Sequence, residues 1–246
     1  MNITALNSKC LASNALPKIK HQKIIEPKRL LTDQSTISII HKIHCRMDLP
    51  LFPLKLVLFP QGLLPLKIFE KRYVDMVRNC LRNQQGFGIV SVCDDHDQTA
   101  PLPFSSVGVL VEIIETNIPQ PGLFSLKCLG KQKFHIQSAV QQKDLLWMGK
   151  VEMLPIEVDT PLPDDLIASK TYFEQLIHSL EEEKIDANAM PFHSPYALND
   201  CAWLANRWCE ILDMPLIQKQ RMLELDSPLI RLELINDMLT KNNAST

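Results

Sequence analysis

The run from Leu49 to Pro60, LPLFPLKLVLFP, constrains the fold of this chain more than any other segment. Only Lys55 interrupts its apolar and proline residues, so the segment must be almost wholly buried. Proline cannot donate a hydrogen bond to a β-ladder, so Pro50 and Pro53 are expected to precede a strand or to lie at its edge. The pattern therefore predicts a core strand over roughly residues 54–59.

A second apolar run and an amphipathic helix are expected directly after it. Pro60-Gln61-Gly62 is a turn signal, and residues 63–68 are again mostly apolar. Helical spacing follows, with an apolar face (Phe69, Tyr73, Met76, Val77, Cys80 and Leu81) and a charged face (Lys71, Arg72, Asp75, Arg78 and Arg82). Two buried strands that lead into one amphipathic helix predict the start of a compact domain.

These residues also carry a family resemblance. The series LPLFPLKLVLFPQGLLPLKIFEKRYVDM, residues 49–76, resembles the opening of the Lon N-terminal domain, the substrate-recognition module at the front of Lon proteases. The resemblance covers about 190 residues in order, through 87–90, 107–109 and 130–136 to LANRWCEILDMPLIQKQRMLELDSPLIRL, residues 204–232. Gln61 stands where the family often has a second glycine, and Gln132 and His135 stand where it often has arginine. The resemblance implies the stand-alone form of the domain, without ATPase and protease domains.

A basic tail precedes an acidic body. Residues 1–46 hold eight Lys or Arg against two Asp or Glu, with no glycine and no aromatic residue, whereas the remaining 200 residues hold 18 basic against 26 acidic side chains. Three interpretations of the tail stay open. It is a disordered basic arm, a targeting peptide, or the result of a start assigned too early, because Met47 directly precedes the first family-like residue.

Cysteine usage and hydropathy favour a cytoplasmic protein. The seven cysteines are scattered without a Cys-x-x-Cys pair, as expected for buried reduced thiols rather than a disulfide framework. No run approaches the roughly 18 apolar residues that a membrane-spanning helix needs. We therefore expect no membrane association.

Short strands are expected up to residue 154. Alternating apolar residues mark strands over 107–116, around 124–128, over 133–140 and over 147–154, with a hairpin turn at Pro119-Gln120-Pro121-Gly122. Several short strands with one early helix favour a small closed or half-open barrel, because closure removes exposed edges. The family resemblance makes this barrel PUA-like.

Helical spacing replaces the strands after the acidic, proline-bearing link of residues 155–165. Apolar stripes are Phe173, Leu176, Ile177 and Leu180; Cys201, Leu204, Ala205, Trp208, Ile211 and Leu212; and Leu232, Ile235 and Leu239. The expected fold class is α+β, with a PUA-like small β-barrel followed by a bundle of about four helices. The expected division is a tail over 1–46, a barrel subdomain over 47–157 and a helical subdomain over 158–246.

The chain carries no recognisable catalytic motif. The phosphate-binding loop, Gly-x-Ser-x-Gly, His-Glu-x-x-His and Gly-x-Gly-x-x-Gly are all absent, so we predict that it is not an enzyme and binds no cofactor. Two clusters contain residue types that ligate metals, Cys93-Asp94-Asp95-His96-Asp97 and His41-x-x-His44-Cys45. The first is interpreted as a solvated loop tip and the second lacks another ligand pair, so no metal site is predicted. His178 near Glu181 and Glu182 is interpreted as an exposed charge pairing.

Three aromatic residues are the candidate binding residues. Trp203 lies off the apolar stripe that contains Trp208, and Phe192 and Tyr196 lie in the loop before it. Exposed together, they could anchor a protein partner. The alternative is that Trp203 packs in the interior.

The resemblance implies non-catalytic recognition of polypeptides, namely unfolded or apolar segments or a protease or chaperone partner, with an adaptor role in protein quality control as a further expectation. The main alternative is an RNA-binding PUA-like protein, and a third possibility is a hydrolase whose catalytic residues form no familiar motif. The excess of eight negative charges on the body argues against strong phosphate binding, because each phosphate contact needs Lys or Arg.

The tail generates the first testable prediction. A chain that begins at Met47 should unfold at the same temperature as the full chain, because residues 1–46 lack the aromatic residues and glycine turns of a packed element. Differential scanning calorimetry of both chains tests this. A midpoint that drops by more than a few degrees on truncation would show that the tail is part of the fold.

Overall fold

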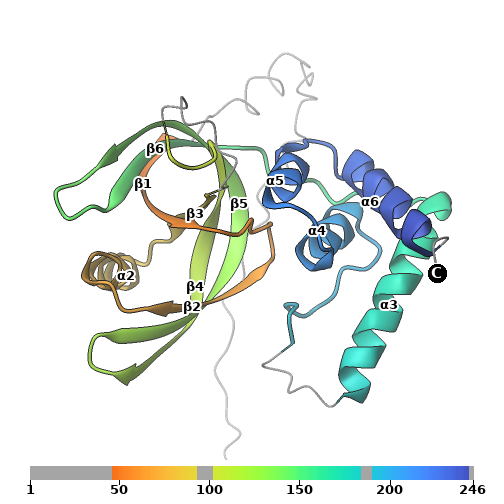
Figure 1. Ribbon diagram of the computed structural model, residues 1–246, viewed down its shortest axis with the longest axis horizontal. Coiled ribbons are helices and arrows are strands. Elements are labelled where there is room, and N and C mark those ends of the chain that lie inside the picture. Colours follow the sequence, from red (N-terminus) through yellow and green to blue (C-terminus); the bar gives the residue numbers. More distant parts are fainter. Residues whose placement is uncertain (1–45, 93–101, 184–189, 244–246) are drawn as a thin grey trace, which may run out of the picture. The chain divides into compact units, whose positions relative to one another are not determined.

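The strands close into a small barrel, with one helix beside it and four helices after it (Figure 1). The computed structural model describes residues 46–92, 102–183 and 190–243. The elements are β1 (Arg46–Leu54), β2 (Leu63–Ile68), α2 (Lys71–Asn83), β3 (Phe87–Ser91), β4 (Val107–Gln120), β5 (Leu123–Gln141), β6 (Trp147–Met153), the short 3-10 helix η1 (Asp164–Leu166), α3 (Ile167–Glu182), α4 (Cys201–Ile211), α5 (Leu216–Glu224) and α6 (Pro228–Asn243).

The long strand β5 closes the barrel. The sheet order is β2-β5-β4-β3-β1-β6, and β6 also pairs with β5. Along one side β5 pairs with β4, while its other side pairs with β2 over residues 124–129 and with β6 over residues 134–141. Shifts in register between β4 and β5 mark bulges, which let so long a strand bend around the barrel. The predicted α+β class, with a barrel before a helical bundle, is confirmed.

The first strand differs from the prediction. A strand was expected over 54–59, but β1 ends at Leu54 and contains both Pro50 and Pro53. β6 pairs with β1 only as far as Leu51, and β3 pairs with it only from Leu51 onward. Each proline therefore has a neighbouring strand on one side only. Its nitrogen, which carries no hydrogen, can point to the other side, where no hydrogen bond is needed. Residues 57–59 are buried as expected, but in a loop.

The amphipathic helix forms where it was predicted, with two exceptions on its apolar face. α2 buries Tyr73, Val74, Met76, Val77 and Cys80 against the barrel. Phe69 and Leu81 were expected on the same face, but they are 71% and 41% exposed. Phe69 precedes the first residue of the helix, so helical spacing does not apply to it, and Leu81 lies at the border of the buried stripe.

Helix α4 is the centre of the C-terminal bundle. Every residue from Cys201 to Cys209 is buried, so this helix has no solvent face along that stretch. Asp200 caps it by accepting hydrogen bonds from the Ala202 and Trp203 N–H groups. Helix α6 begins at Pro228, and the Ser227 hydroxyl accepts a hydrogen bond from the Ile230 N–H at 3.4 Å. Among the described helices, none is long and apolar enough to cross a bilayer.

Several sequence predictions concern residues outside the described ranges. They are the basic tail up to residue 45 with His41, His44 and Cys45, and the cluster from Cys93 to Asp97. Within the described ranges, one hydrophobic cluster includes residues of α2, the barrel strands and all four C-terminal helices. The barrel and the bundle thus share a core.

The burial of α4 generates a stability prediction. The Trp208 side chain is 6% exposed and donates through Nε1 to the Ser169 carbonyl at 3.1 Å, and Trp203 is 1% exposed. Replacing either residue by alanine leaves a large cavity, so each change should cost on the order of 3–5 kcal/mol of unfolding free energy. Urea denaturation measures the loss. A loss under about 1 kcal/mol at either position would contradict the packing of this helix.

Candidate functional site

An apolar groove runs between the barrel and the helical bundle. It has a volume of about 490 Å³, and all but two of its lining residues are apolar. The β1–β2 loop and β2 form one wall, while α3, the segment before α4, the end of α4 and the start of α5 form the other. Its lining residues are Leu56, Val57, Leu58, Leu63, Leu64, Leu176, Leu180, Pro191, Phe192, Glu210, Ile211, Leu216 and Lys219.

A second hollow continues the groove over the barrel. It has a volume of about 650 Å³ and shares Leu63 and Pro191 with the apolar groove. Its floor is one face of the β2–β5–β4 corner, where Pro65 lies opposite Lys127 and Asn117 lies opposite Ser125. Lys127 and Glu115 form an ion pair at 3.4 Å on this floor. The second hollow has more polar residues in its lining than the apolar groove, namely Glu115, Thr116, Asn117, Ser125 and Lys127.

The turn from residue 59 to residue 62 ties the barrel wall to α4. Arg207, whose side chain is fully buried, donates to the Pro60 carbonyl at 2.8 Å and forms an ion pair with Glu210. A Cβ atom at Gly62 would lie 2.9 Å from the Phe59 carbonyl oxygen and would also collide with the Glu210 carboxylate, so a side chain there would force the turn to shift. Gln61 holds a left-handed backbone with φ of 62°, which explains why glycine suits that position as well.

Glu210 is one of the two charged groups in the lining of the apolar groove. Its side chain is 20% exposed, and burial raises the pKa of its carboxyl to about 7. The Arg207 guanidinium, the Phe59 N–H and Lys219 oppose that rise in pKa. Lys219 is the other charged group of the lining.

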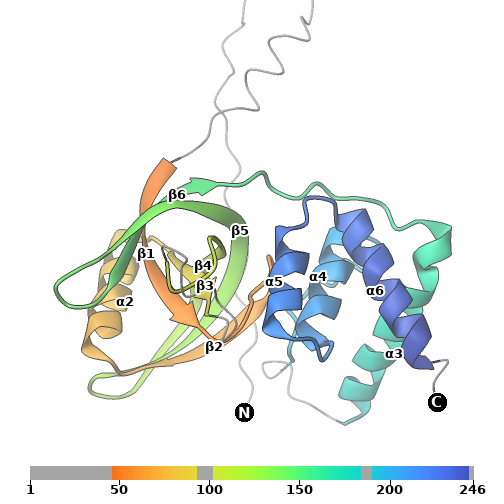
Figure 2. The ribbon, with the colours of Figure 1, turned by 45° about the horizontal axis from the view of Figure 1, so that its top comes forward.

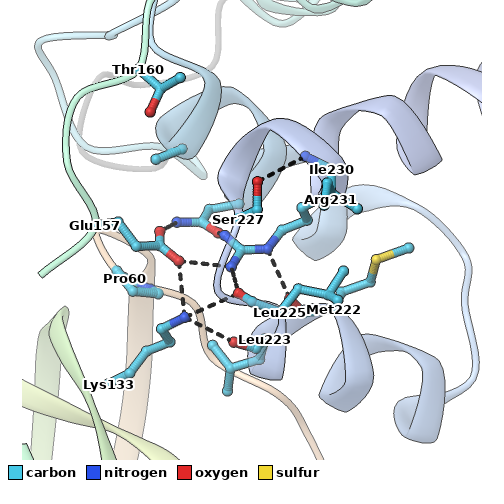
Figure 3. A network of polar contacts seen from close by, with 12 residues as sticks. Pro60, Lys133, Glu157, Thr160, Met222, Leu223, Leu225, Ser227, Ile230 and Arg231 are labelled. Atoms are coloured by element: carbon cyan, nitrogen blue, oxygen red, sulfur yellow. Dashed lines mark hydrogen bonds and ion pairs between the residues drawn. The ribbon is translucent and has the colours of Figure 1, made fainter. Parts of the chain in front are cut away.

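A buried ionic network fixes the barrel against the bundle behind this turn (Figure 3). Lys133 comes from β5, Glu157 from the link after β6, Asn206 from α4 and Arg231 from α6. Glu157 Oε1 lies 3.1 Å from Lys133 Nζ and 2.7 Å from Arg231 Nη2, and Asn206 Nδ2 donates to its other oxygen at 3.1 Å. One carboxylate thus joins the barrel to two helices.

Backbone carbonyls at the C-terminal end of α5 accept the remaining hydrogen bonds of both cations, Lys133 and Arg231. Lys133 also donates to the Leu223 and Leu225 carbonyls, and Arg231 donates to the Met222 and Leu225 carbonyls. Arg231 Nη1 donates to Asn206 Oδ1 at 2.6 Å. The end of a helix carries partial negative charge, which favours cations there. With its three donors all satisfied, Lys133 can be buried at 4% exposure.

The network sets the ionisation of Glu157. Burial by itself would raise the pKa of this carboxyl. The hydrogen bond from Arg231, the charges of Arg231 and Lys133, and the hydrogen bond from Asn206 outweigh burial and lower the pKa below its usual 4.5. Glu157 is therefore ionised at neutral pH and holds the two cations together.

The three candidate aromatic residues do lie together, but inside the bundle. Tyr196 is half-buried. Trp203 is 1% exposed and Phe192 is 4% exposed, so the interpretation that Trp203 packs in the interior holds and the hypothesis of an exposed cluster does not. Phe173 lies between them, 5.0 Å from Phe192 and 5.5 Å from Trp203 between ring centroids. The reason is that α4 is buried on all sides, so no position off its apolar stripe reaches solvent. Phe192 still lines the apolar groove.

None of the four residues of the ionic network was predicted from the sequence. One feature of the sequence could have indicated Asn206 as a buried polar residue. The segment from Cys201 to Cys209 is apolar at every position except Asn206 and Arg207, and a helix that is apolar all round is buried. Its polar residues then need buried partners. In the described part of the chain, no group of three or more His, Cys, Asp or Glu side chains is placed to hold a metal ion.

The fold and its sequence have known relatives. A crystal structure of a Lon N-terminal domain protein from Xanthomonas campestris is 26% identical, with a TM-score of 0.62 over 77% of this chain and 96% of that chain. The N-terminal domain of the Mycobacterium avium complex Lon protease shares the fold at 16% identity, with a TM-score of 0.51 over 78% of this chain and 97% of that one. The barrel and bundle thus have the fold of Lon N-terminal domains.

The family follows from the sequence match. Residues 48–241 match the model of the ATP-dependent protease La (LON) substrate-binding domain, and the chain belongs to that family, as the resemblance predicted. The match is to the substrate-binding domain and not to ATPase or protease domains. The RNA-binding alternative has no support from these comparisons.

Two curated relatives are much longer than this chain. Lon protease of Anaeromyxobacter dehalogenans (strain 2CP-C) is 23% identical over 218 residues, which are 82% of this chain and 24% of that protein. Protein cereblon of Danio rerio is 27% identical over 131 residues, which are 52% of this chain and 30% of that protein. The chain therefore spans less than a third of the length of either relative.

The ionic network generates a prediction about acid. The pKa of Glu157 is lower in the folded chain than in the unfolded chain, so its stabilising effect is complete above about pH 4.5 and is lost as the pH falls further. Glu157→Gln should lower stability at pH 7 by about 3–5 kcal/mol, because two buried cations lose their carboxylate. It should also flatten the decline below pH 4.5.

Urea denaturation from pH 3 to pH 8 measures both effects. Glu233→Gln, at an exposed position of α6, is the matched control and should leave the pH profile unchanged. A Glu157→Gln variant as stable as the control at pH 7 would show that the network does not hold the barrel and bundle together.

Proposed function

We propose that this chain is a non-catalytic module that binds apolar segments of unfolded or extended polypeptides in the apolar groove. The observation that carries the proposal is the composition of that groove, in which only Glu210 and Lys219 interrupt an apolar lining contributed by both the barrel and the bundle. A site of this kind gains affinity from burying apolar side chains and selects little else. That is the chemistry that recognition of unfolded chains requires.

The geometry suits an extended segment. The apolar groove continues into the hollow over the β2–β5–β4 corner, where Asn117 and Ser125 offer polar atoms to a bound main chain. Apolar side chains would enter the half-exposed positions around Leu63, Leu180 and Ile211. Few fixed polar contacts imply micromolar affinity and weak sequence preference. Membership of a substrate-binding domain family supports the same function.

The ionic network has a supporting part in this proposal. The groove walls belong to separate parts of the fold, so their spacing depends on how the barrel and bundle are joined. Lys133, Glu157 and Arg231 form that joint from side chains that are less than 10% exposed. A rigid joint keeps the groove open in the absence of an occupant, which reduces the ordering cost of binding.

An adaptor role in protein quality control follows as part of the proposal. In this role the chain passes a bound polypeptide to a protease or chaperone, and its membership of the Lon substrate-binding domain family supports that role. We expect this to take place in the cytoplasm, where the buried cysteines stay reduced.

Two matched double variants test the groove. Leu180→Ser with Ile211→Ser removes two apolar lining residues, whereas Ile230→Ser with Leu234→Ser changes two exposed apolar residues of α6 outside the groove. Loss of two partly buried contacts should weaken binding about tenfold in the first variant and leave it unchanged in the second. Fluorescence anisotropy with a labelled apolar peptide from a denatured protein measures this.

The same titration at two salt concentrations separates this binding from charge-driven binding. Apolar burial is not screened, so affinity should change little between low and moderate salt. Equal affinities for both double variants would place the binding site elsewhere, and binding that weakens steeply with salt would refute an apolar groove as the recognition element.

A further inference from the structure

Three exposed apolar residues lie in segments on the side of the barrel opposite α4 and α5. In both views α2 and the turn between β5 and β6 lie at that side (Figures 1 and 2). Phe69, just before α2, is 71% exposed, and Val140 and Leu145, at the β5–β6 turn, are 68% and 55% exposed. We call these three residues with Lys67 and Lys71 the α2 surface. It shares no residue with the apolar groove.

Leu145 combines an exposed side chain with an unfavourable backbone conformation. Its φ is 69°, a left-handed conformation that is strained for a bulky side chain. Arg72 Nη1 donates to its carbonyl at 3.0 Å, and the same guanidinium forms an ion pair with Glu70 at 2.8 Å. Arg72 thus links the segment that begins with Phe69 to the β5–β6 turn. The left-handed backbone closes the β5–β6 turn, in which the Leu145 N–H donates to the Gln142 carbonyl at 2.9 Å and the Gln142 N–H donates to the Leu146 carbonyl at 2.8 Å. The Leu145 side chain nevertheless stays 55% exposed.

The charges around these apolar residues have one sign in excess. From residue 67 to residue 82 there are five cations and two carboxylates. Glu70 and Asp75 are both paired, with Arg72 and Arg78 respectively. Lys67, Lys71 and Arg82 are exposed and have no carboxylate within ion-pair distance among the described residues. This excess is local, since the chain from residue 47 onward carries eight more acidic than basic side chains.

From this combination we infer that the α2 surface docks an acidic segment of a partner polypeptide that also carries large apolar side chains. The apolar side chains would cover Phe69 and Leu145, and the carboxylates would pair with Lys67 and Lys71. Charge complementarity identifies this occupant. Two carboxylates stand among the cations, which suits a peptide with spaced charges better than a continuous anionic surface such as a membrane or a nucleic acid.

Variants of exposed residues test the inference without disturbing the fold. The probe is a labelled synthetic peptide rich in Asp and Glu that carries two leucines, titrated against the full chain. Phe69→Ser should weaken binding about fivefold through lost apolar contact, and Lys67→Glu with Lys71→Glu should weaken it about tenfold. The loss caused by the charge reversal should shrink at high salt. Val158→Ser, at a 78% exposed position of the link, and Lys150→Glu with Arg221→Glu are matched controls and should have no effect.

Binding of the apolar groove peptide to the same variants distinguishes the two sites. The affinity for the apolar groove peptide should be unchanged by Phe69→Ser. If the acidic peptide fails to bind the α2 surface, the proposed function of the groove is therefore not affected. If the apolar peptide fails to bind the groove, the inference about the α2 surface is likewise not affected. Undetectable peptide binding, or equal binding by all variants, would overturn the inference. Two further results would overturn it in favour of another occupant: phosphatidylserine vesicles or RNA that bind through Phe69 and Lys71 in place of the peptide, or a dimer that dissociates when Lys67 and Lys71 are reversed.

Discussion

The buried carboxylate of Glu157 is the interaction on which the arrangement of barrel and bundle depends. Two cations, Lys133 from the barrel and Arg231 from the last helix, have no solvent to stabilise their charges, so they require this anion and the carbonyls at the end of α5. Such a network adds little net stability compared with apolar packing, but it accepts only one geometry. Its value for this fold is therefore orientation of the two halves.

Orientation matters because the proposed binding groove exists only between those halves. One wall is the β1–β2 loop with β2, and the other is built from α3, α4 and α5. The contact of Arg207 with Pro60, and the absence of a side chain at Gly62, bring the walls together at one end. A substitution in this joint would thus impair binding without touching the occupant. The α2 surface depends on the barrel alone, so such a substitution should spare it.

Some parts of the structure could be predicted because their causes are local. The second strand, α2 and the hairpin at Gly122 follow from apolar spacing and turn residues. The errors have a common origin in tertiary neighbours. Pro50 and Pro53 stay within β1 because each lies beside one strand only, and Trp203 is buried because α4 is surrounded by other elements.

The sequence by itself determined the fold class and the family, because apolar periodicity, turn residues and the Lon-like segments are local patterns that can be recognised without the structure. It also determined that no familiar catalytic motif is present. Only the tertiary structure decided which charged residues are buried and where the apolar groove lies. Lys133, Glu157, Asn206 and Arg231 are far apart in sequence, and no local pattern relates them. Their pairing, and the groove that it holds open, result from packing between distant elements. This packing leaves no local pattern in a single sequence.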